Sequence, residues 1–266
     1  MDILETIVAH KKTEVEAAKA KVSVDELKQR PAFGRPTLSL KQFLVDEKRT
    51  GIIAEFKRKS PSKGIINDKA TVAEVTGAYE KYGASCLSVL TDEKFFGGSP
   101  ADLIAARANN IPILRKDFMI DAYQLYEARA MGADVILLIA ACLTPQQVKK
   151  LAGIAKELQL EVLLEIHNED ELPHICDEVD FVGVNNRNLK TFEVDINTSL
   201  KLIQHIPADK LAIAESGISN VDTIVTLKRA GFKGFLIGEN FMKAAQPSIA
   251  FAEFVNTLRT SLQVSV

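Results

Sequence analysis

From Gly51 to the end of the chain, short apolar runs alternate with longer stretches in which apolar residues recur at helical spacing. Short runs of branched or aromatic residues that stop at glycine, proline or charge are typical of fully buried strands. The pattern predicts eight strands, at residues 52–56, 86–90, 113–115, 134–139, 161–166, 181–184, 212–215 and 235–237.

Helical patterns lie between the predicted strands and after the last one. Three of these helices end on a glycine directly before the next apolar run, at Gly83, Gly132 and Gly231. Glycine suits the left-handed residue that caps a helix C-terminus, so these joints are repeated helix-to-strand turns. The predicted helices cover residues 71–82, 100–109, 122–131, 145–158, 169–177, 196–205, 221–230 and 250–262.

Eight successive strand–helix units predict an α/β fold, a (β/α)₈ TIM barrel. That fold typically takes about 250 residues, and the chain has 266. A doubly wound open sheet is the alternative, but it usually has fewer strands and a glycine-rich first turn. Because no G-x-G-x-x-G motif follows any predicted strand, the barrel is favoured.

The N-terminal segment before Gly51 has a different pattern. Ile3 and Ile7 fall near helical spacing among lysine, glutamate and alanine, which predicts an amphipathic helix. A second helix is expected to begin at Ser23, with Glu26 placed to complete a capping box. Residues 39–47 predict a third, short helix.

Composition narrows the class of protein. The 33 basic and 35 acidic residues leave a formal charge of -2, which gives no general attraction to nucleic acid or acidic membranes. The longest apolar run, residues 135–143, is too short to span a bilayer, and the N-terminus lacks a signal-peptide core. Cys86, Cys142 and Cys176 are too far apart in sequence to suggest a zinc site or a disulfide framework. We expect a cytoplasmic protein with one domain over residues 1–266, in which a helical extension (1–50) packs on the barrel (51–266).

Charged and polar residues gather where the predicted strands stop. In a (β/α)₈ barrel the active site lies at that carboxyl end, so these residues are candidates for catalysis. Glu55 and Lys57 lie on one face of the first strand, and a structural ion pair is the alternative explanation for them. Recurrence on five strands favours a catalytic site, because the other strands supply Lys116 and Asp117, Glu165, Asn185 and Arg187, and Glu215 and Ser216.

The role of Lys116 has two interpretations. A lysine among carboxylates in a dry site can be a proton donor, whereas a crowded lysine can be a Schiff-base nucleophile. The sequence leaves both open. His167, two residues after Glu165, is interpreted as structural, and the remaining histidines are predicted to be surface residues: His10, His174 and His205.

Glycines follow the last two predicted strands, at Gly217 and Gly238. The corresponding loops of this fold commonly hold a phosphate group with their backbone N–H groups. Lys59 and Ser60 can reach the same place from the first loop, so we expect a phosphate site. Aromatic residues after the second, third and sixth strands either pack in the core or form the wall of an apolar pocket: Phe95, Phe96, Phe118 and Phe192.

Five of these segments together closely resemble indole-3-glycerol phosphate synthase. The resemblance extends over essentially the whole chain, including the helical extension, and the motifs occur in the order of that family. They are residues 53–62 (IAEFKRKSPS), 114–118 (LRKDF), 164–167 (LEIH), 183–189 (GVNNRNL) and 214–218 (AESGI).

The resemblance implies a decarboxylating lyase of tryptophan biosynthesis. Its substrate would be the phosphosugar derivative 1-(2-carboxyphenylamino)-1-deoxyribulose 5-phosphate, closed to indole-3-glycerol phosphate with loss of carbon dioxide and water. The resemblance implies no cofactor and no metal. Members of the family are often monomers, and we expect the same here.

The resemblance also assigns roles to residues. Lys116 matches the general acid, Lys57 a second lysine that binds the substrate carboxylate, and Glu165 and Glu55 the proposed bases. Asn185, Arg187 and Glu215, with Ser216 nearby, match substrate-binding positions. The ring would be enclosed by Phe96, Phe118, Leu137 and Phe192, and the phosphate bound by Lys59, Ser60, Gly217, Gly238 and Glu239.

The chain departs from the family pattern in two ways. Some members have a serine where this chain has Glu239, and some have a tryptophan in the extension, whereas this chain has none. Two other functions remain possible from the residues themselves. One is a phosphosugar isomerase or Schiff-base aldolase, and the other is a barrel that only binds a phosphorylated ligand as a regulatory or scaffold protein.

Overall fold

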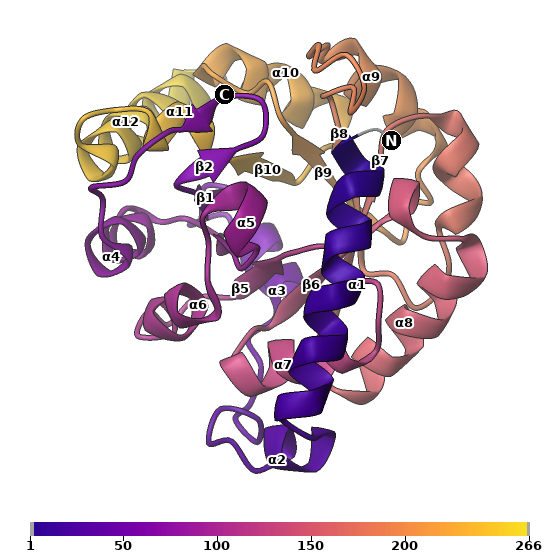
Figure 1. Ribbon diagram of the computed structural model, residues 1–266. Coiled ribbons are helices and arrows are strands. Elements are labelled where there is room, and N and C mark those ends of the chain that lie inside the picture. Colours follow the sequence, from indigo (N-terminus) through magenta and orange to yellow (C-terminus); the bar gives the residue numbers. More distant parts are fainter. Residues whose placement is uncertain (1–2, 265–266) are drawn as a thin grey trace.

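The computed structural model describes residues 3–264, and its centre is a closed barrel of parallel strands. Consecutive strands pair around the barrel, and the last pairs back onto the first, with Phe235 opposite Ile52. Every strand boundary lies within one residue of its predicted position, which confirms the (β/α)₈ barrel (Figure 1). The strands are β1 (Ile52–Phe56), β4 (Cys86–Leu90), β5 (Ile113–Lys116), β6 (Val135–Ile139), β7 (Glu161–Ile166), β8 (Phe181–Asn185), β9 (Leu211–Glu215) and β10 (Gly234–Ile237).

Helices surround the barrel in the positions that the apolar periodicity predicts (Figure 1). They cover the outer faces of the strands, so that each strand is buried on both sides, as a parallel sheet requires. The helices are α4 (Val72–Tyr82), α6 (Pro100–Ala106), α7 (Tyr123–Met131), α8 (Pro145–Glu157), α9 (Asn197–Leu202), α10 (Val221–Ala230) and α12 (Pro247–Val264).

Two predicted helices differ in detail from the observed ones. Residues 169–177 form only a 3₁₀ helix, η2 (Glu169–His174), with Pro173 inside it. Proline lacks an N–H group and disfavours the α conformation of the residue before it, so an α-helix does not develop. The helix after β8 changes to a 3₁₀ turn, η3 (Ile203–His205), at its C-terminal end.

The sequence predicted the helix-ending turns of this fold but not the short elements in its loops. Gly83, Gly132 and Gly231 cap α4, α7 and α10 in the left-handed conformation, as predicted. The loops at the carboxyl end of the barrel carry short elements that the apolar pattern did not predict. These are the antiparallel pair β2 (Lys59–Ser60) and β3 (Gly64–Ile65), α5 (Glu93–Phe96), η1 (Ala140–Cys142) and α11 (Glu239–Met242).

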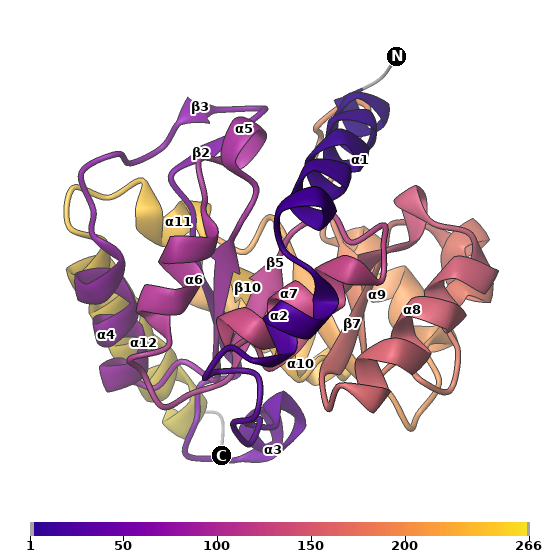
Figure 2. The same cartoon turned by 60° about the horizontal axis from the view of Figure 1, so that its bottom comes forward.

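The N-terminal extension forms α1 (Ile3–Lys21), α2 (Val24–Lys28) and α3 (Leu40–Val45). The predicted capping box is present, with the Ser23 N–H donating to Glu26 at 2.7 Å and the Glu26 N–H donating to Ser23 Oγ. Figure 2 shows α1 at one end of the barrel, beside the loops, and α3 at the opposite end. The extension therefore contacts both ends of the barrel.

Two apolar layers hold the barrel together. One lies between the strands and the outer helices, and the other fills the barrel interior. In α3, Leu40 and Leu44 belong to the interior layer and close the amino end of the barrel, where the Leu40 N–H donates to Glu161 at 2.6 Å. Within residues 3–264, no helix has both the length and the apolar character needed to cross a bilayer.

Candidate active site

A cavity of about 500 Å³ opens at the carboxyl end of the barrel. Of all the residues predicted for catalysis, substrate binding or phosphate binding, only Lys59 does not line it. The Lys59 ammonium instead donates to the backbone carbonyl of Lys94 at 3.0 Å. Because the strands are parallel and closed into a barrel, side chains from distant parts of the sequence meet in one site.

Lys116 lies at the centre of this site. Its Nζ is 3.0 Å from Glu165 Oε2 and 3.1 Å from Glu215 Oε2. Burial by itself would lower the pKa of Lys116, but the carboxylates of Glu165, Glu215 and Glu55 outweigh it and raise that pKa above its ordinary value. Lys116 is therefore an ammonium at neutral pH.

Glu55 and Lys57 form the second charged pair. Alternation along β1 places both on the face that points into the barrel, and Lys57 Nζ lies 2.8 Å from Glu55 Oε1. Ser88 donates to the other oxygen of Glu55 at 3.3 Å. The Glu55 side chain is almost completely buried, whereas Lys57 is partly exposed toward the cavity.

The two carboxyl groups beside Lys116 have opposite pKa shifts. Burial raises the pKa of both, but Lys116 and His167 more than compensate at Glu165, whose pKa is held well below its ordinary value. At Glu215, burial and the negative charge of Glu165 outweigh the effect of Lys116 and raise the pKa to about 7. At neutral pH Glu165 is ionised, whereas Glu215 is partly protonated.

One side of the cavity is apolar. The rings of Phe96 and Phe118 lie 5.9 Å apart between centroids at a tilted angle, and Leu137 adds an aliphatic side chain to the cavity lining. Phe192, in the loop after β8, is 39% exposed and borders the entrance. An aromatic ring of a substrate would find a complementary surface here.

The opposite side is formed by tight turns after β9 and β10. Ser216 and Gly217 both have positive φ, at 66° and 75°, and a Cβ at Gly217 would come within 2.4 Å of Val194. Gly238 precedes α11, whose first residue, Glu239, lies 3.7 Å from the Arg187 guanidinium. Backbone amides in such turns can approach an anionic group closely.

Within residues 3–264, no group of three or more His, Cys, Asp or Glu side chains is arranged to hold a metal ion. The charged cluster around Lys116 and Lys57 instead consists of cations paired with carboxylates, beside the Asn185 amide, which donates to Glu165 at 2.9 Å. This arrangement is suited to proton transfer and to binding an anionic substrate.

Comparisons with known proteins identify the family. The family model for indole-3-glycerol phosphate synthase matches residues 4–254. The chain belongs to the indole-3-glycerol phosphate synthase family. An indole-3-glycerol phosphate synthase of Bacteroides thetaiotaomicron is 48% identical over 97% of this chain and 99% of its own length. One of Albidiferax ferrireducens is 43% identical, over 96% of this chain and 99% of its own length.

Solved structures of proteins with other names share the barrel fold. A tryptophan synthase complex from Pyrococcus furiosus matches with a TM-score of 0.59 at 18% identity, over 80% of this chain and 99% of that one. A 3-hexulose-6-phosphate synthase matches with a TM-score of 0.61 at 16% identity, over 79% and 98%. At such identities the likeness shows only that the barrel is shared.

In this synthase-family chain, the N-terminal extension reaches the site in a way that the sequence did not indicate. Ile3, Leu4 and Ile7 of α1 line the cavity beside its aromatic wall. Lys11, one helical turn after Ile7, is almost completely buried, and its ammonium lies 2.9 Å from both Asp92 and Asp117.

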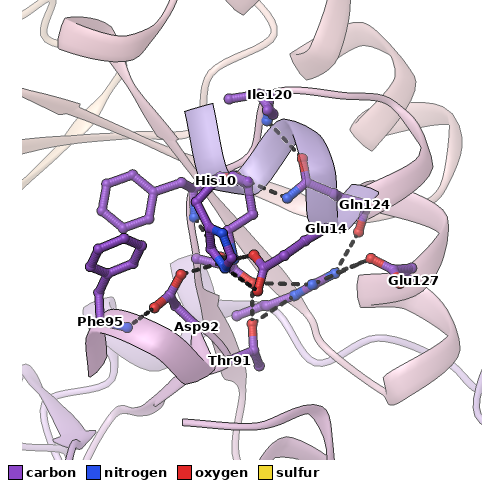
Figure 3. A network of polar contacts seen from close by, with 12 residues as sticks. His10, Glu14, Thr91, Asp92, Phe95, Ile120, Gln124 and Glu127 are labelled. Atoms are coloured by element: carbon purple, nitrogen blue, oxygen red, sulfur yellow. Dashed lines mark hydrogen bonds and ion pairs between the residues drawn. The ribbon is translucent and has the colours of Figure 1, made fainter. Parts of the chain in front are cut away.

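A network of polar contacts surrounds this attachment of α1 (Figure 3). Thr91 donates to Asp117 at 2.6 Å, and Arg115 donates to Thr91 and to the backbone carbonyl of Gln124. Asp117, which was grouped with Lys116 by sequence position, therefore pairs with Arg115 and the extension, while Lys116 points into the barrel. Strand alternation explains the opposite directions.

His167, which is interpreted from sequence as structural, lies against Glu165. Its Nε2 lies 3.2 Å from Glu165 Oε1, and its side chain is 9% exposed. The signal was present in the sequence, because a residue two positions after Glu165 lies on the same side of the chain as that carboxylate. The same spacing correctly paired Glu55 with Lys57.

Proposed function

We propose that this cavity closes the indole ring of 1-(2-carboxyphenylamino)-1-deoxyribulose 5-phosphate, as the family identity suggests. The observation that carries the proposal is the Lys116 ammonium held between Glu165 and Glu215 at the base of the cavity. An apolar wall stands on one side and glycine turns on the other. These two sides suit the aryl ring and the phosphate of such a substrate.

Ring closure begins with a bond between two substrate carbons. The ring carbon that bears the carboxylate attacks the ketone carbon, and the ketone oxygen takes a proton from Lys116. The carboxylate then leaves as carbon dioxide, and its bonding electrons restore the aromatic ring. Lys57, next to Glu55 at the cavity wall, is placed to bind the leaving carboxylate. Arg187 and Asn185 line the same cavity and would orient the substrate.

Dehydration completes the indole. The hydroxyl on the former ketone carbon leaves as water after protonation by Lys57, and a carboxylate removes a proton from the neighbouring methylene carbon. Glu165 is the base that we assign to this step, since it is ionised while Glu215 exchanges a proton. Glu55, paired with Lys57, stabilises that ammonium rather than acting alone as the base.

The state of Lys116 favours proton donation over Schiff-base chemistry. A nucleophilic amine needs a free lone pair and typically has a lowered pKa, whereas the carboxylates around Lys116 raise its pKa. A barrel that only bound ligands would gain nothing from this buried charged cluster, since each charge must be removed from water.

The phosphate would lie against the turns after β9 and β10. Ser216, Gly217, Gly238 and Glu239 line that side, with Ser60 opposite. Asn240 and Lys243 also line it, although the sequence did not single them out. Lys59 would join them by leaving the Lys94 carbonyl, to which its ammonium donates.

The test is to mix the purified protein with the substrate without added metal and to follow indole fluorescence. The chain has no tryptophan, so its own background is small. Lys116→Met is expected to lower kcat by at least about 10²-fold, which is typical of the loss of a general acid, while substrate still binds.

Lys233→Met is the matched control, because Lys233 is exposed just before β10 at the amino end of the barrel. It should turn over substrate like the unmodified protein. Near-normal turnover by Lys116→Met would contradict the assignment of Lys116 as the acid.

We also propose that the protein acts as a cytoplasmic monomer folded as a single domain. Among the large exposed apolar side chains, Phe192 and Val194 lie together in the loop after β8 and line the cavity, whereas Val45 of α3, Ile104 of α6 and Ile249 of α12 lie on separate helices. A stable dimer typically needs a contiguous apolar patch. Sedimentation should therefore give a mass near 29.2 kDa, and cell fractionation should place the protein in the cytoplasm.

A further inference from the structure

Lys116 is almost equidistant from two carboxyl groups. Its Nζ lies 3.0 Å from Glu165 and 3.1 Å from Glu215. Both side chains are almost completely buried, and their backbones belong to strands of the same barrel. The attraction of the ammonium to the two carboxyl groups is therefore nearly equal, so it does not determine which of them is ionised.

The second oxygen of each carboxyl group has very different surroundings. Glu165 Oε1 accepts a hydrogen bond from Asn185 at 2.9 Å and lies 3.2 Å from His167 Nε2. Glu215 Oε1 is buried without a hydrogen-bond partner among the described residues. It packs against the backbone of Gly183, where a Cβ would come within 2.2 Å of it. A buried carboxylate oxygen with no donor is unfavourable, whereas a protonated carboxyl group tolerates that position better.

His167 is itself held in place by a second acid. Its Nδ1 lies 3.2 Å from Glu171 Oε2, and the same oxygen accepts the His167 backbone N–H at 2.7 Å. Glu171 belongs to η2, the short helix directly after β7. Nδ1 is hydrogen-bonded to Glu171, whereas Nε2 contacts Glu165 at ion-pair distance without forming a hydrogen bond. A carboxylate beside each ring nitrogen favours the imidazolium cation.

We propose that His167, held in place by Glu171, is a positioning residue for Glu165. It keeps Glu165 ionised beside Lys116, so that Glu215 is the carboxyl group of this pair that binds a proton. The groups that face Glu165 are Lys116 from β5, Asn185 from β8 and His167 from the end of β7 itself. The paired position on β6 is Ile139, which is uncharged. The pKa of His167 supports this inference, since its two carboxylates overcome the effect of burial and raise it to about 10.

By keeping Glu165 ionised, His167 would make Glu165 the base of the reaction, an assignment that rests on the proposed function. Before the reaction, Glu165 is a weak base because two cations stabilise its charge. Once Lys116 has given its proton to the ketone oxygen, one of those cations is neutral and Glu165 becomes more basic. Acid catalysis would then prepare the base for the proton removal that follows.

The experiment is a ¹³C NMR titration of the protein labelled at glutamate carboxyl carbons. Glu165→Gln and Glu215→Gln variants assign the two resonances. In the unmodified protein, Glu215 is expected to titrate near neutral pH while Glu165 stays ionised to much lower pH. In His167→Asn, the titration midpoint of Glu165 should rise by about one pH unit or more.

Glu171→Gln provides a second variant if His167→Asn does not fold. The amide can still accept the His167 backbone N–H, but it removes the negative charge behind the imidazole, so a smaller upward shift is expected. His205→Asn is the control, since His205 is exposed in η3, away from the site, and both midpoints should stay unchanged. Identical Glu165 titrations in the unmodified protein, His167→Asn and Glu171→Gln would overturn the proposal.

A pH profile of kcat/KM adds a kinetic measurement. The acidic limb should move to higher pH in His167→Asn and less so in Glu171→Gln. If both variants only lose thermal stability and keep the profile, His167 is purely structural. If the unmodified protein fails to convert the substrate, the proposed function fails, but the NMR titration still decides the role of His167.

Discussion

At the scale of single residues, Lys116 is held as an ammonium by carboxyl groups that lie 49 and 99 positions further along the chain. The alternation of strand side chains turns Lys116, Glu165 and Glu215 inward, and the closed barrel brings them together. Gly183 provides the space for one of them, because any side chain there would collide with Glu215. The protonation of the cluster follows from these contacts.

The titration of Glu215 predicts a pH dependence of stability. Its pKa is about 7 in the folded protein against an ordinary value of 4.5, so the folded state binds the proton more tightly. The free energy of unfolding should therefore fall as pH rises from 4.5 through 7 and should level off once Glu215 is fully ionised in the folded protein. In Glu215→Gln this contribution, at most about 3 kcal/mol, should be absent.

Urea unfolding of both proteins at pH 5 and at pH 8 measures the difference. Relative to the unmodified protein, Glu215→Gln should be more stable at pH 8 than at pH 5. Titrating groups that lie away from Glu215 affect both proteins alike, so they cancel in the comparison. Parallel pH profiles would show that Glu215 is ionised in the folded protein over the whole range.

At the scale of elements, the three helices of the extension serve different ends of the barrel. The apolar residues of α3 close the amino end, while α1 lies at the carboxyl end and contributes Ile3, Leu4 and Ile7 to the cavity (Figure 2). Both α1 and α2 pack on α7, where Tyr123 donates to the Val22 carbonyl at 2.8 Å. The attachment nearest the cavity is the contact of Lys11 with Asp92 and Asp117.

Removal of this attachment should have a large effect on stability. Lys11→Met leaves Asp92, which is fully buried, without its cation. Asp117 keeps Arg115 as its cation and the hydrogen bond from Thr91, and Glu14 loses its contact with Lys11. Loss of one partner of a buried ion pair typically costs about 3–5 kcal/mol. Urea unfolding should show a loss of this order, and hydrogen exchange should show weaker protection of α1.

Lys12→Met is the control for this prediction, because Lys12 lies next to Lys11 on the same helix but is exposed. It should change the free energy of unfolding by less than about 0.5 kcal/mol. Equal effects of the two variants would mean that the buried contact of Lys11 does not stabilise the attachment.

At the scale of the whole molecule, the barrel is closed by contacts between its first and last units. Strand β10 pairs with β1, and outside them α12 packs on α4. Phe251 of α12 is fully buried, with its ring centroid 4.7 Å from that of Tyr79 in α4 and 5.1 Å from that of Phe241 in α11. This aromatic cluster joins residues from opposite ends of the barrel sequence.

Phe251→Ala should therefore destabilise the entire fold. Truncation of a buried phenylalanine typically costs about 3–5 kcal/mol, from lost burial and from the cavity that remains. If the chain is a single domain, calorimetry should show one transition at a lower midpoint for extension and barrel together. Ile249→Ala, on the same helix but 50% exposed, should have a small effect. A second transition that survives Phe251→Ala would show that the extension or part of the barrel folds independently.

Much of this protein is determined by the sequence alone. The eight apolar runs predicted every barrel strand, since a strand buried on both faces must be apolar throughout. The glycine caps and the Ser23 capping box were also predictable, because they depend on a few neighbouring residues. The same local alternation indicated that Glu55 and Lys57 share one face of the first strand.

Only the tertiary structure decided how those residues are paired. The distances between Lys116, Glu165 and Glu215 depend on the register of strands that lie far apart in sequence. The burial of Lys11, the position of Lys59 outside the cavity and the contact of His167 with Glu165 likewise depend on neighbours from other elements. The sequence pattern determines which way a side chain points along its own strand or helix, whereas its charge state depends on what the folded barrel places opposite it.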